Sequence, residues 1–348
     1  MKTVILLTFS HFLFVFAQAQ VSRSRYPYLM GGRFDITIVA KDSLAAEENI
    51  DAVIAEISRI EYLISDWKPE TQVSQVNVNA GIRPVKVDQE VLELAERAIH
   101  ISELTHGAFD ISFAAMERIW KFDGSMTQMP SPEAVSKARE KVGYKNIIIN
   151  RDSSTIFLKL KGMKIGFGAL GEGYAGDKCR DLMIEKEITA GLINATGDIQ
   201  TWGTKPDGSP WYIGINNPFE NDRLIAAVPL EEAITTSGSY EKYAMIDGKR
   251  YAHIINPATG YPATGLTSVS VLGPSAEFCN ALSTSIMVLG KAKGKKLLKQ
   301  FPQYKCVMIS DKGKYYTANG FKLKKYAVRY CNTSLLKLGK PCEGVDGL

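Results

Sequence analysis

The sequence has little that would indicate a membrane-spanning, nucleic-acid-binding or repetitive protein. After one N-terminal apolar run, no stretch approaches the ~20 apolar residues that a spanning helix needs. The net charge of +5 is not concentrated in long basic runs, and the densest cluster, from Lys291 to Lys299, is typical of the solvated face of a helix. There is no internal repeat and no low-complexity linker. With 45% hydrophobic and 23% charged residues, the composition is that of an ordinary globular protein, and no nucleic-acid partner is expected.

Cysteine and histidine are also scarce. The chain has five cysteines, whose spacings match no zinc site, and four histidines. Cys179 and Cys279 are expected to be buried small apolar residues rather than nucleophiles. Cys331 and Cys342 bracket a short tail, and whether they form a disulfide is left open. The fifth cysteine is Cys306.

The N-terminus has the pattern of a secretory signal peptide. Lys2 supplies a positive charge, an apolar run covers residues 4–16, and Ala17-Gln18-Ala19 is an A-x-A cleavage site. The run is too short for a comfortable membrane anchor. No cysteine lies at the cleavage point, so a lipoprotein is not expected. The sequence therefore predicts a signal peptide over residues 1–19 and an exported protein, in the periplasm or elsewhere outside the cytoplasm.

Hydrophobic periodicity predicts an α+β protein, because helices and strands are mixed without strict alternation. Asp247-Gly248 is typical of a tight hairpin turn. Helices are expected over residues 44–65, 92–105, 131–142, 275–289 and 291–300, with one more running from the glycine-rich stretch 166–176 to about residue 187. Strands are expected over residues 34–40, 147–150, 155–160, 191–195, 211–215, 226–230, 233–236, 243–246 and 268–272.

Five loop segments gather glycine, proline and polar residues, and each has both a structural and a functional interpretation. Glycines after Met30 could form only a turn, or could allow a ligand close to the backbone. Trp67 could pack on the core or stack on a flat ring. Asp110 could be only a helix N-cap. Glycines 166–173 open a helix, where free N–H groups suit a phosphate, although no Walker or Rossmann pattern is present and Glu172 would repel a phosphate.

The fifth segment joins Thr235-Thr236-Ser237-Gly238-Ser239-Tyr240 to His253-Ile254-Ile255-Asn256-Pro257-Ala258-Thr259-Gly260. A lone histidine is more often structural than catalytic. Its position between a hairpin strand and a turn, beside the hydroxyl-rich segment, favours a catalytic or ligand-binding role.

In their order along the chain, these motifs resemble the ApbE family of FAD:protein FMN transferases. The motifs are Met-Gly, Ala-Phe-Asp, Gly-Glu-Gly-Tyr-Ala-Gly-Asp, Thr-Gly-Asp, Thr-Ser-Gly-Ser-Tyr and His-Ile-Ile-Asn-Pro-x-Thr-Gly. The resemblance covers residues 28 to about 325. It implies a single ApbE-like α+β domain, related to the T-fold, with mixed sheets and flanking helices over residues 20–330, followed by a tail over 331–348.

The resemblance also implies a function and a set of site residues. The expected reaction is metal-assisted transfer of FMN from FAD to a Thr or Ser hydroxyl of an acceptor flavoprotein, with release of AMP. His253 would be the general base. The expected FAD contacts are Met30, Trp67, Ala108, Phe109, Asp110, Glu172, Ser237 and His253. The expected Mg²⁺ ligands are the carbonyl of Ala169 and the side chains of Asn280, Ser283 and Thr284.

Three positions depart from the family pattern. Gly166 and Asn280 stand where the family usually has aspartate, so each removes a carboxylate, and Mg²⁺ prefers anionic oxygens. Asn256 replaces a common aspartate and cannot act as a base. Two rival functions therefore remain: a non-catalytic FAD-binding protein and a Mg²⁺-dependent FAD pyrophosphatase.

Overall fold

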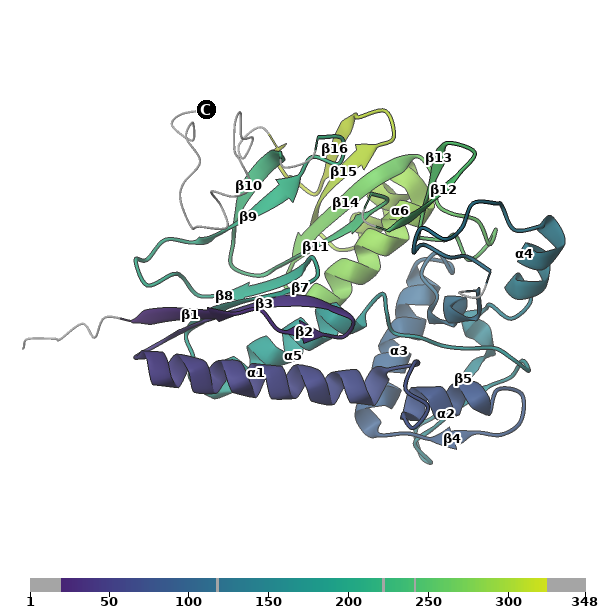
Figure 1. Ribbon diagram of the computed structural model, residues 1–348, viewed down its shortest axis with the longest axis horizontal. Coiled ribbons are helices and arrows are strands. Elements are labelled where there is room, and N and C mark those ends of the chain that lie inside the picture. The colour runs from purple at the N-terminus through teal and green to yellow at the C-terminus, as the bar shows by residue number, and fades with distance from the viewer. Residues whose placement is uncertain (1–19, 117–118, 221–222, 241, 324–348) are drawn as a thin grey trace, which may run out of the picture.

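The central layer of the protein is an antiparallel β-sheet (Figure 1). A computed structural model describes residues 20–116, 119–220, 223–240 and 242–323. Nine strands form the sheet, in the order β1-β3-β7-β8-β11-β14-β15-β16, with β2 paired to β3. They span Val21–Arg25 (β1), Tyr28–Leu29 (β2), Gly32–Ala40 (β3), Ala190–Ala195 (β7), Asp198–Trp202 (β8), Ala233–Gly238 (β11), Leu266–Gly273 (β14), Lys305–Ser310 (β15) and Tyr315–Ala318 (β16).

Side-chain alternation along the strands gives the sheet two apolar faces. One face packs on the long helices α1 (Ser43–Ile64), α5 (Gly171–Glu185) and α6 (Ala276–Leu298). The other packs on the hairpin of β9 (Trp211–Asn216) and β10 (Leu224–Leu230). On β11, Ala233 belongs to the cluster beneath α6, and the next residue, Ile234, belongs to the cluster beneath the hairpin. The helices and the hairpin therefore enclose the sheet.

A smaller helical region extends the same core at one end of the sheet (Figure 1). One cluster of buried side chains runs from Ile36 and Ile57 to Leu92 and Ile156. The elements of this region are α2 (Gln72–Val78), α3 (Gln89–Leu104), α4 (Pro132–Arg139), the 3₁₀ helices η1 (Ile111–Met116) and η2 (Tyr144–Asn146), and the small sheet of β4 (Val85–Lys86), β5 (Ile147–Asn150) and β6 (Thr155–Leu158).

The α+β class expected from the sequence is confirmed. The hairpin of β12 (Tyr243–Ile246) and β13 (Lys249–Ala252) turns at Asp247 and Gly248, both at positive φ, as that dipeptide predicts. Residues 276–298 form one continuous segment with a kink at Gly290 (φ 73°, ψ 173°), which lies where the sequence predicted a break between two helices. In the part of the chain that the structure describes, no helix has the length and apolar content needed to cross a membrane. The expected signal peptide and the pair Cys331 and Cys342 lie outside the described residues.

A carboxylate on α5 joins that helix to the start of α6. Asp177 accepts hydrogen bonds from the hydroxyl of Ser275 (2.6 Å) and from the backbone N–H groups of Ala276 (2.8 Å) and Glu277 (3.1 Å). A Cβ atom at Gly173 would lie 2.6 Å from the Ala276 carbonyl oxygen, so the two helices touch backbone to backbone. Asp177 therefore caps α6 from a neighbouring helix and stabilises its dipole.

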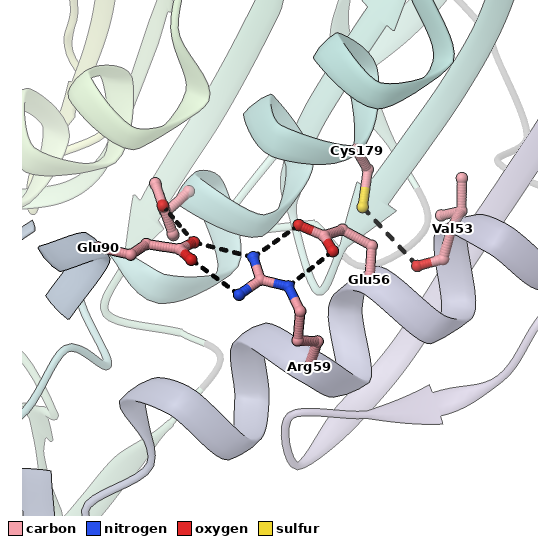
Figure 2. Close-up of polar contacts among 6 residues, drawn as sticks. Val53, Glu56, Arg59, Glu90 and Cys179 are labelled. Carbon is pink, nitrogen blue, oxygen red and sulfur yellow. Dashed lines mark hydrogen bonds and ion pairs between the residues drawn. The ribbon is translucent and has the colours of Figure 1, made fainter. Parts of the chain in front are cut away.

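An arginine between two carboxylates ties α1 to α3 (Figure 2). The Arg59 guanidinium donates two hydrogen bonds to Glu56, both 2.8 Å long, and two to Glu90, 2.7 and 2.9 Å long. The Tyr174 hydroxyl on α5 also donates to Glu90 (2.6 Å). These bonds hold the pKa of Glu90 below its ordinary value, with Arg59 as the main cause. Cys179, buried nearby as expected, points its thiol at the Val53 carbonyl oxygen.

Replacing Arg59 by methionine is expected to lower the free energy of unfolding by about 1 kcal/mol, since charge-assisted bonds at a half-exposed position are partly screened. Because the pKa of Glu90 is depressed, the stabilisation exists above the ordinary pKa of 4.5 and disappears as the pH falls through the folded-state value. Urea denaturation at neutral and acidic pH measures both effects. The control is Arg151→Met, which breaks a similar pair with Glu96 at a site where Arg151 is 73% exposed, and a smaller loss is expected there. An equal loss in the two variants would contradict the prediction.

Candidate active site

Four oxygen-bearing side chains meet where the end of β11 passes α6. The Ser237 hydroxyl lies 2.8 Å from the Ser283 hydroxyl and 3.3 Å from the Thr284 hydroxyl. Thr284 also donates to the Asn280 amide oxygen (3.3 Å). Positions 280, 283 and 284 share one helix face because they are three and four residues apart. These four residues, called here the α6 oxygen cluster, comprise one expected FAD contact and three expected metal ligands.

The structure adds a carboxylate to this cluster that the sequence analysis did not single out. The Asn280 amide nitrogen donates to Asp198, which begins β8 and is 6% exposed. Asp198 ends the Thr-Gly-Asp motif, so the sequence did contain a signal for it. The Asp198 carboxylate is therefore hydrogen-bonded to Asn280, the residue that stands where the family usually has an aspartate.

A second buried oxygen lies on the same side of the sheet. Thr235 is fully buried, and its hydroxyl has no hydrogen-bond partner among the described residues. Carboxylate, amide and hydroxyl oxygens are what Mg²⁺ binds, usually with water and substrate phosphates completing its shell. Within the described residues no group of three or more His, Cys, Asp or Glu side chains gathers to hold a metal by itself. The oxygens present fit a hard cation that takes its remaining ligands from a phosphate-containing substrate.

The glycine-rich segment continues into α5: residues 166–170 precede the helix, and Gly171 and Gly173 lie in its first turn. The N-terminus of α5 has no side-chain cap. A Cβ atom at Gly168 would meet nothing within 4 Å, whereas one at Gly171 would lie 2.7 Å from Ile64 and 3.3 Å from the Met30 side chain. The segment thus has an open side at Gly168 and a packed side against Met30. Open backbone at an uncapped helix end suits a phosphate.

Asp66 takes the space that a side chain at position 166 would fill. A Cβ atom at Gly166 would lie only 3.1 Å from the Asp66 carboxylate. Burial raises the pKa of Asp66 above its ordinary value. Asp66 belongs to the Ser65-Asp66-Trp67 segment that the sequence analysis noted for its tryptophan alone. The carboxylate of Asp66, which follows α1, therefore lies beside the position where Gly166 lacks one.

Glu172, in the first turn of α5, is held by a residue in the turn between β7 and β8. The Thr196 hydroxyl donates to its carboxylate. Burial raises the pKa of Glu172 above its ordinary value, while Thr196 and the charge of Lys242 partly oppose that rise.

His253 follows β13 and is bound by the backbone of Lys242. Its Nδ1 lies 3.1 Å from the Lys242 carbonyl oxygen. A carbonyl oxygen only accepts, so Nδ1 carries the proton and Nε2 keeps a lone pair. Burial is the main cause that lowers the pKa of His253 below 6.5; the hydrogen bond to the Lys242 carbonyl opposes this, and the charge of Lys242 adds to it. The imidazole is therefore neutral at pH 7 and able to accept a proton.

The remaining expected FAD contacts have distinct environments. Asp110 accepts from the Ser112 backbone N–H and from the Tyr144 backbone N–H, both 2.8 Å, so it anchors η1 as the N-cap interpretation predicts. Ala108 and Phe109 are buried. Trp67 is 79% exposed and so does not pack on the core, which leaves its ring free to stack on a ligand. The assignment of these residues to FAD remains a prediction.

Comparisons with known proteins identify relatives of the chain. The model of the ApbE family matches residues 30–308. The FAD:protein FMN transferase of Klebsiella pneumoniae (strain 342) is 29% identical over 278 residues, covering 78% of this chain and 79% of the relative. That of Treponema pallidum (strain Nichols) is 29% identical over 277 residues, covering 75% and 76%. The crystal structure of the ApbE protein from Thermotoga maritima superposes with a TM-score of 0.79 at 29% identity, covering 87% of this chain and 99% of that one. The chain belongs to the ApbE family.

Proposed function

We propose that this chain transfers FMN from FAD to a Thr or Ser hydroxyl of an acceptor protein, with Mg²⁺ assisting and AMP leaving. The observation that carries the proposal is the α6 oxygen cluster beside Asp198, because it joins hydroxyl, amide and carboxylate oxygens in one place. The relatives named above are FAD:protein FMN transferases, which supports the same reaction here.

The reaction requires a base, a cradle for phosphates and charge neutralisation. The acceptor oxygen attacks the phosphorus of the FMN half of FAD, the pyrophosphate P–O bond breaks, and AMP leaves with the bonding electrons. Nε2 of His253 would take the proton of the acceptor hydroxyl. The open backbone before α5 would hold a phosphate. Bound Mg²⁺ would offset the phosphate charge and be held by Asn280, Ser283 and Thr284, with Ala169 contributing its carbonyl.

The place of action is part of the proposal. The N-terminal pattern over residues 1–19 supports export, to the periplasm or elsewhere outside the cytoplasm. An acceptor would then be a flavoprotein whose redox domain faces that compartment.

The expected result of the direct test is a covalently flavinylated acceptor. The mature protein is incubated with FAD, Mg²⁺ and a flavin-acceptor domain, and in-gel flavin fluorescence and AMP release are measured. Release of AMP without a labelled acceptor would instead indicate a pyrophosphatase. Bound FAD with neither product would indicate a carrier, an interpretation that the missing aspartates favour and the nearby Asp198 and Asp66 oppose.

A further inference from the structure

Asn280 has two different neighbours, one for each end of its amide. Its nitrogen donates to Asp198, and its oxygen accepts from the Thr284 hydroxyl (3.3 Å). Reversing the amide would put its oxygen against the carboxylate, where both groups could only accept. The two contacts therefore specify one orientation, in which the amide oxygen faces the hydroxyls of the α6 oxygen cluster.

The sheet register places Thr235 on the same face as this pair. Ala233 lies opposite Gln200 and Ile234 opposite Ile199 in the β8–β11 ladder. Thr235 is two residues after Ala233, and Asp198 is two residues before Gln200, so both point to the face of that pair. Residues directly opposite one another in an antiparallel pair point to the same face, which here is the face under α6. The unpartnered hydroxyl of Thr235 and the carboxylate of Asp198 thus share the buried side of the cluster.

We infer that Asp198 is the positioning residue of the cation site in this chain: it orients the Asn280 amide so that its oxygen is presented to the ion, and it supplies the negative charge that Asn280 lacks. The inference rests on the metal-assisted reaction proposed above. An amide oxygen is a neutral ligand. A carboxylate that accepts a hydrogen bond from the amide nitrogen polarises the amide and makes its oxygen more negative. Groups that orient metal ligands in this way typically change metal affinity by about 10–100-fold when removed.

Asp198→Asn is therefore expected to weaken Mg²⁺ binding by about 10–100-fold. The site loses its negative charge, and the new amide can donate as well as accept, so it no longer fixes the orientation of the Asn280 amide. The exchange variant, Asp198→Asn with Asn280→Asp, keeps an amide–carboxylate pair and moves the charge onto the ligand itself. It is expected to recover Mg²⁺ affinity to within about threefold of the parent or better, since carboxylates are the preferred Mg²⁺ ligands. A purely structural role of Asp198 would leave Mg²⁺ affinity at the parental value in a folded Asp198→Asn variant.

Asn280→Asp alone sets two carboxylates against each other. The sequence alone predicts tighter metal binding with an intact fold. With Asp198 in contact, the metal-free protein is instead expected to melt at a lower temperature than the parent, and Mg²⁺ is expected to raise that temperature more than it does for the parent.

The measurements are calorimetric titration with Mg²⁺, electron paramagnetic resonance with Mn²⁺, and thermal melting with and without Mg²⁺, each on the full mature chain with and without FAD. The control is Asp35→Asn. It alters another Asn–Asp pair of the same sheet, in which Asn194 donates to Asp35 (3.3 Å) across β3 and β7, and parental Mg²⁺ affinity is expected.

Parental Mg²⁺ affinity in Asp198→Asn, or an exchange variant as weak as Asp198→Asn, would overturn the inference. If Asp198→Asn does not fold, the exchange variant and the Mg²⁺-dependent melting of Asn280→Asp decide the question. Failure of the proposed function is separate. If Asp198→Asn weakens Mg²⁺ binding but the parent labels no acceptor, only the proposed transfer is contradicted. If the parent labels an acceptor but Asp198→Asn keeps parental Mg²⁺ affinity, only the inference about Asp198 is contradicted.

Discussion

Replacing His253 by alanine is expected to slow FMN transfer by about 10²–10⁴-fold, the usual effect of removing a general base. The bond from Nδ1 to the Lys242 carbonyl leaves Nε2 as the proton acceptor. Because burial lowers the pKa of His253 below 6.5, the imidazole stays neutral on acidification from pH 7, and the rate should fall only below pH 6.5. The transfer rate is measured from pH 5 to 8 for the parent and the variant.

The control for this experiment is His100→Ala, since His100 is an exposed histidine on α3 (69% exposed side chain). It should keep the parental rate and pH profile. FAD binding is followed separately by flavin fluorescence, so that a lost base is distinguished from a lost FAD contact. Transfer by His253→Ala within about threefold of the parent would show that His253 is not the base.

Two valine substitutions in the glycine-rich segment are expected to affect different properties, FAD binding in one case and stability in the other. Gly168 faces open space, so Gly168→Val should fold normally and weaken FAD binding by at least about tenfold by filling the open side of the segment. Gly173 contacts the Ala276 carbonyl, so Gly173→Val should lower the free energy of unfolding by about 1–3 kcal/mol or more through overpacking. Calorimetry with FAD and urea denaturation measure the two quantities.

The structure separates two glycines that the sequence groups together as suited to a phosphate. Gly168 faces open space, whereas Gly173 lies where α5 closely approaches α6. Parental FAD affinity in a folded Gly168→Val would contradict a phosphate site at this loop. A Gly173→Val variant of parental stability would contradict the helix–helix interpretation.

Long elements with clear periodicity were predictable from the sequence, whereas the two-residue strands, the short helix α2 and the strands after α6 were not. Helix α1 and strand β3 were expected within a few residues of their observed bounds, because their apolar residues recur at helical spacing or alternate with polar ones. The two-residue strands β2 and β4 are too short to show a period. Helix α2 is only seven residues long, and β15 and β16 follow the last motif that drew attention.

The site residues also fall into two groups, those that motifs identified and those that only the structure revealed. Ser237, Asn280, Ser283 and Thr284 were named from motifs, and the structure brings them into contact. Asp198 and Asp66 were missed because their importance depends on residues 82 and 100 positions away in the chain, Asn280 and Gly166. A motif shows which residues are near in sequence, whereas a replaced carboxylate is visible only in three dimensions.

The Asp177 cap has a consequence for anyone who would graft this site onto another scaffold. Helix α5 holds the first turn of α6, the helix that carries Asn280, through three hydrogen bonds to the Asp177 carboxylate. If either helix is transplanted without the other, the N–H groups at the start of α6 lose the Asp177 carboxylate that caps them. A functional chimera with a relative would have to exchange α5 and α6 together, along with the turn between β7 and β8 and Asp198 at the start of β8.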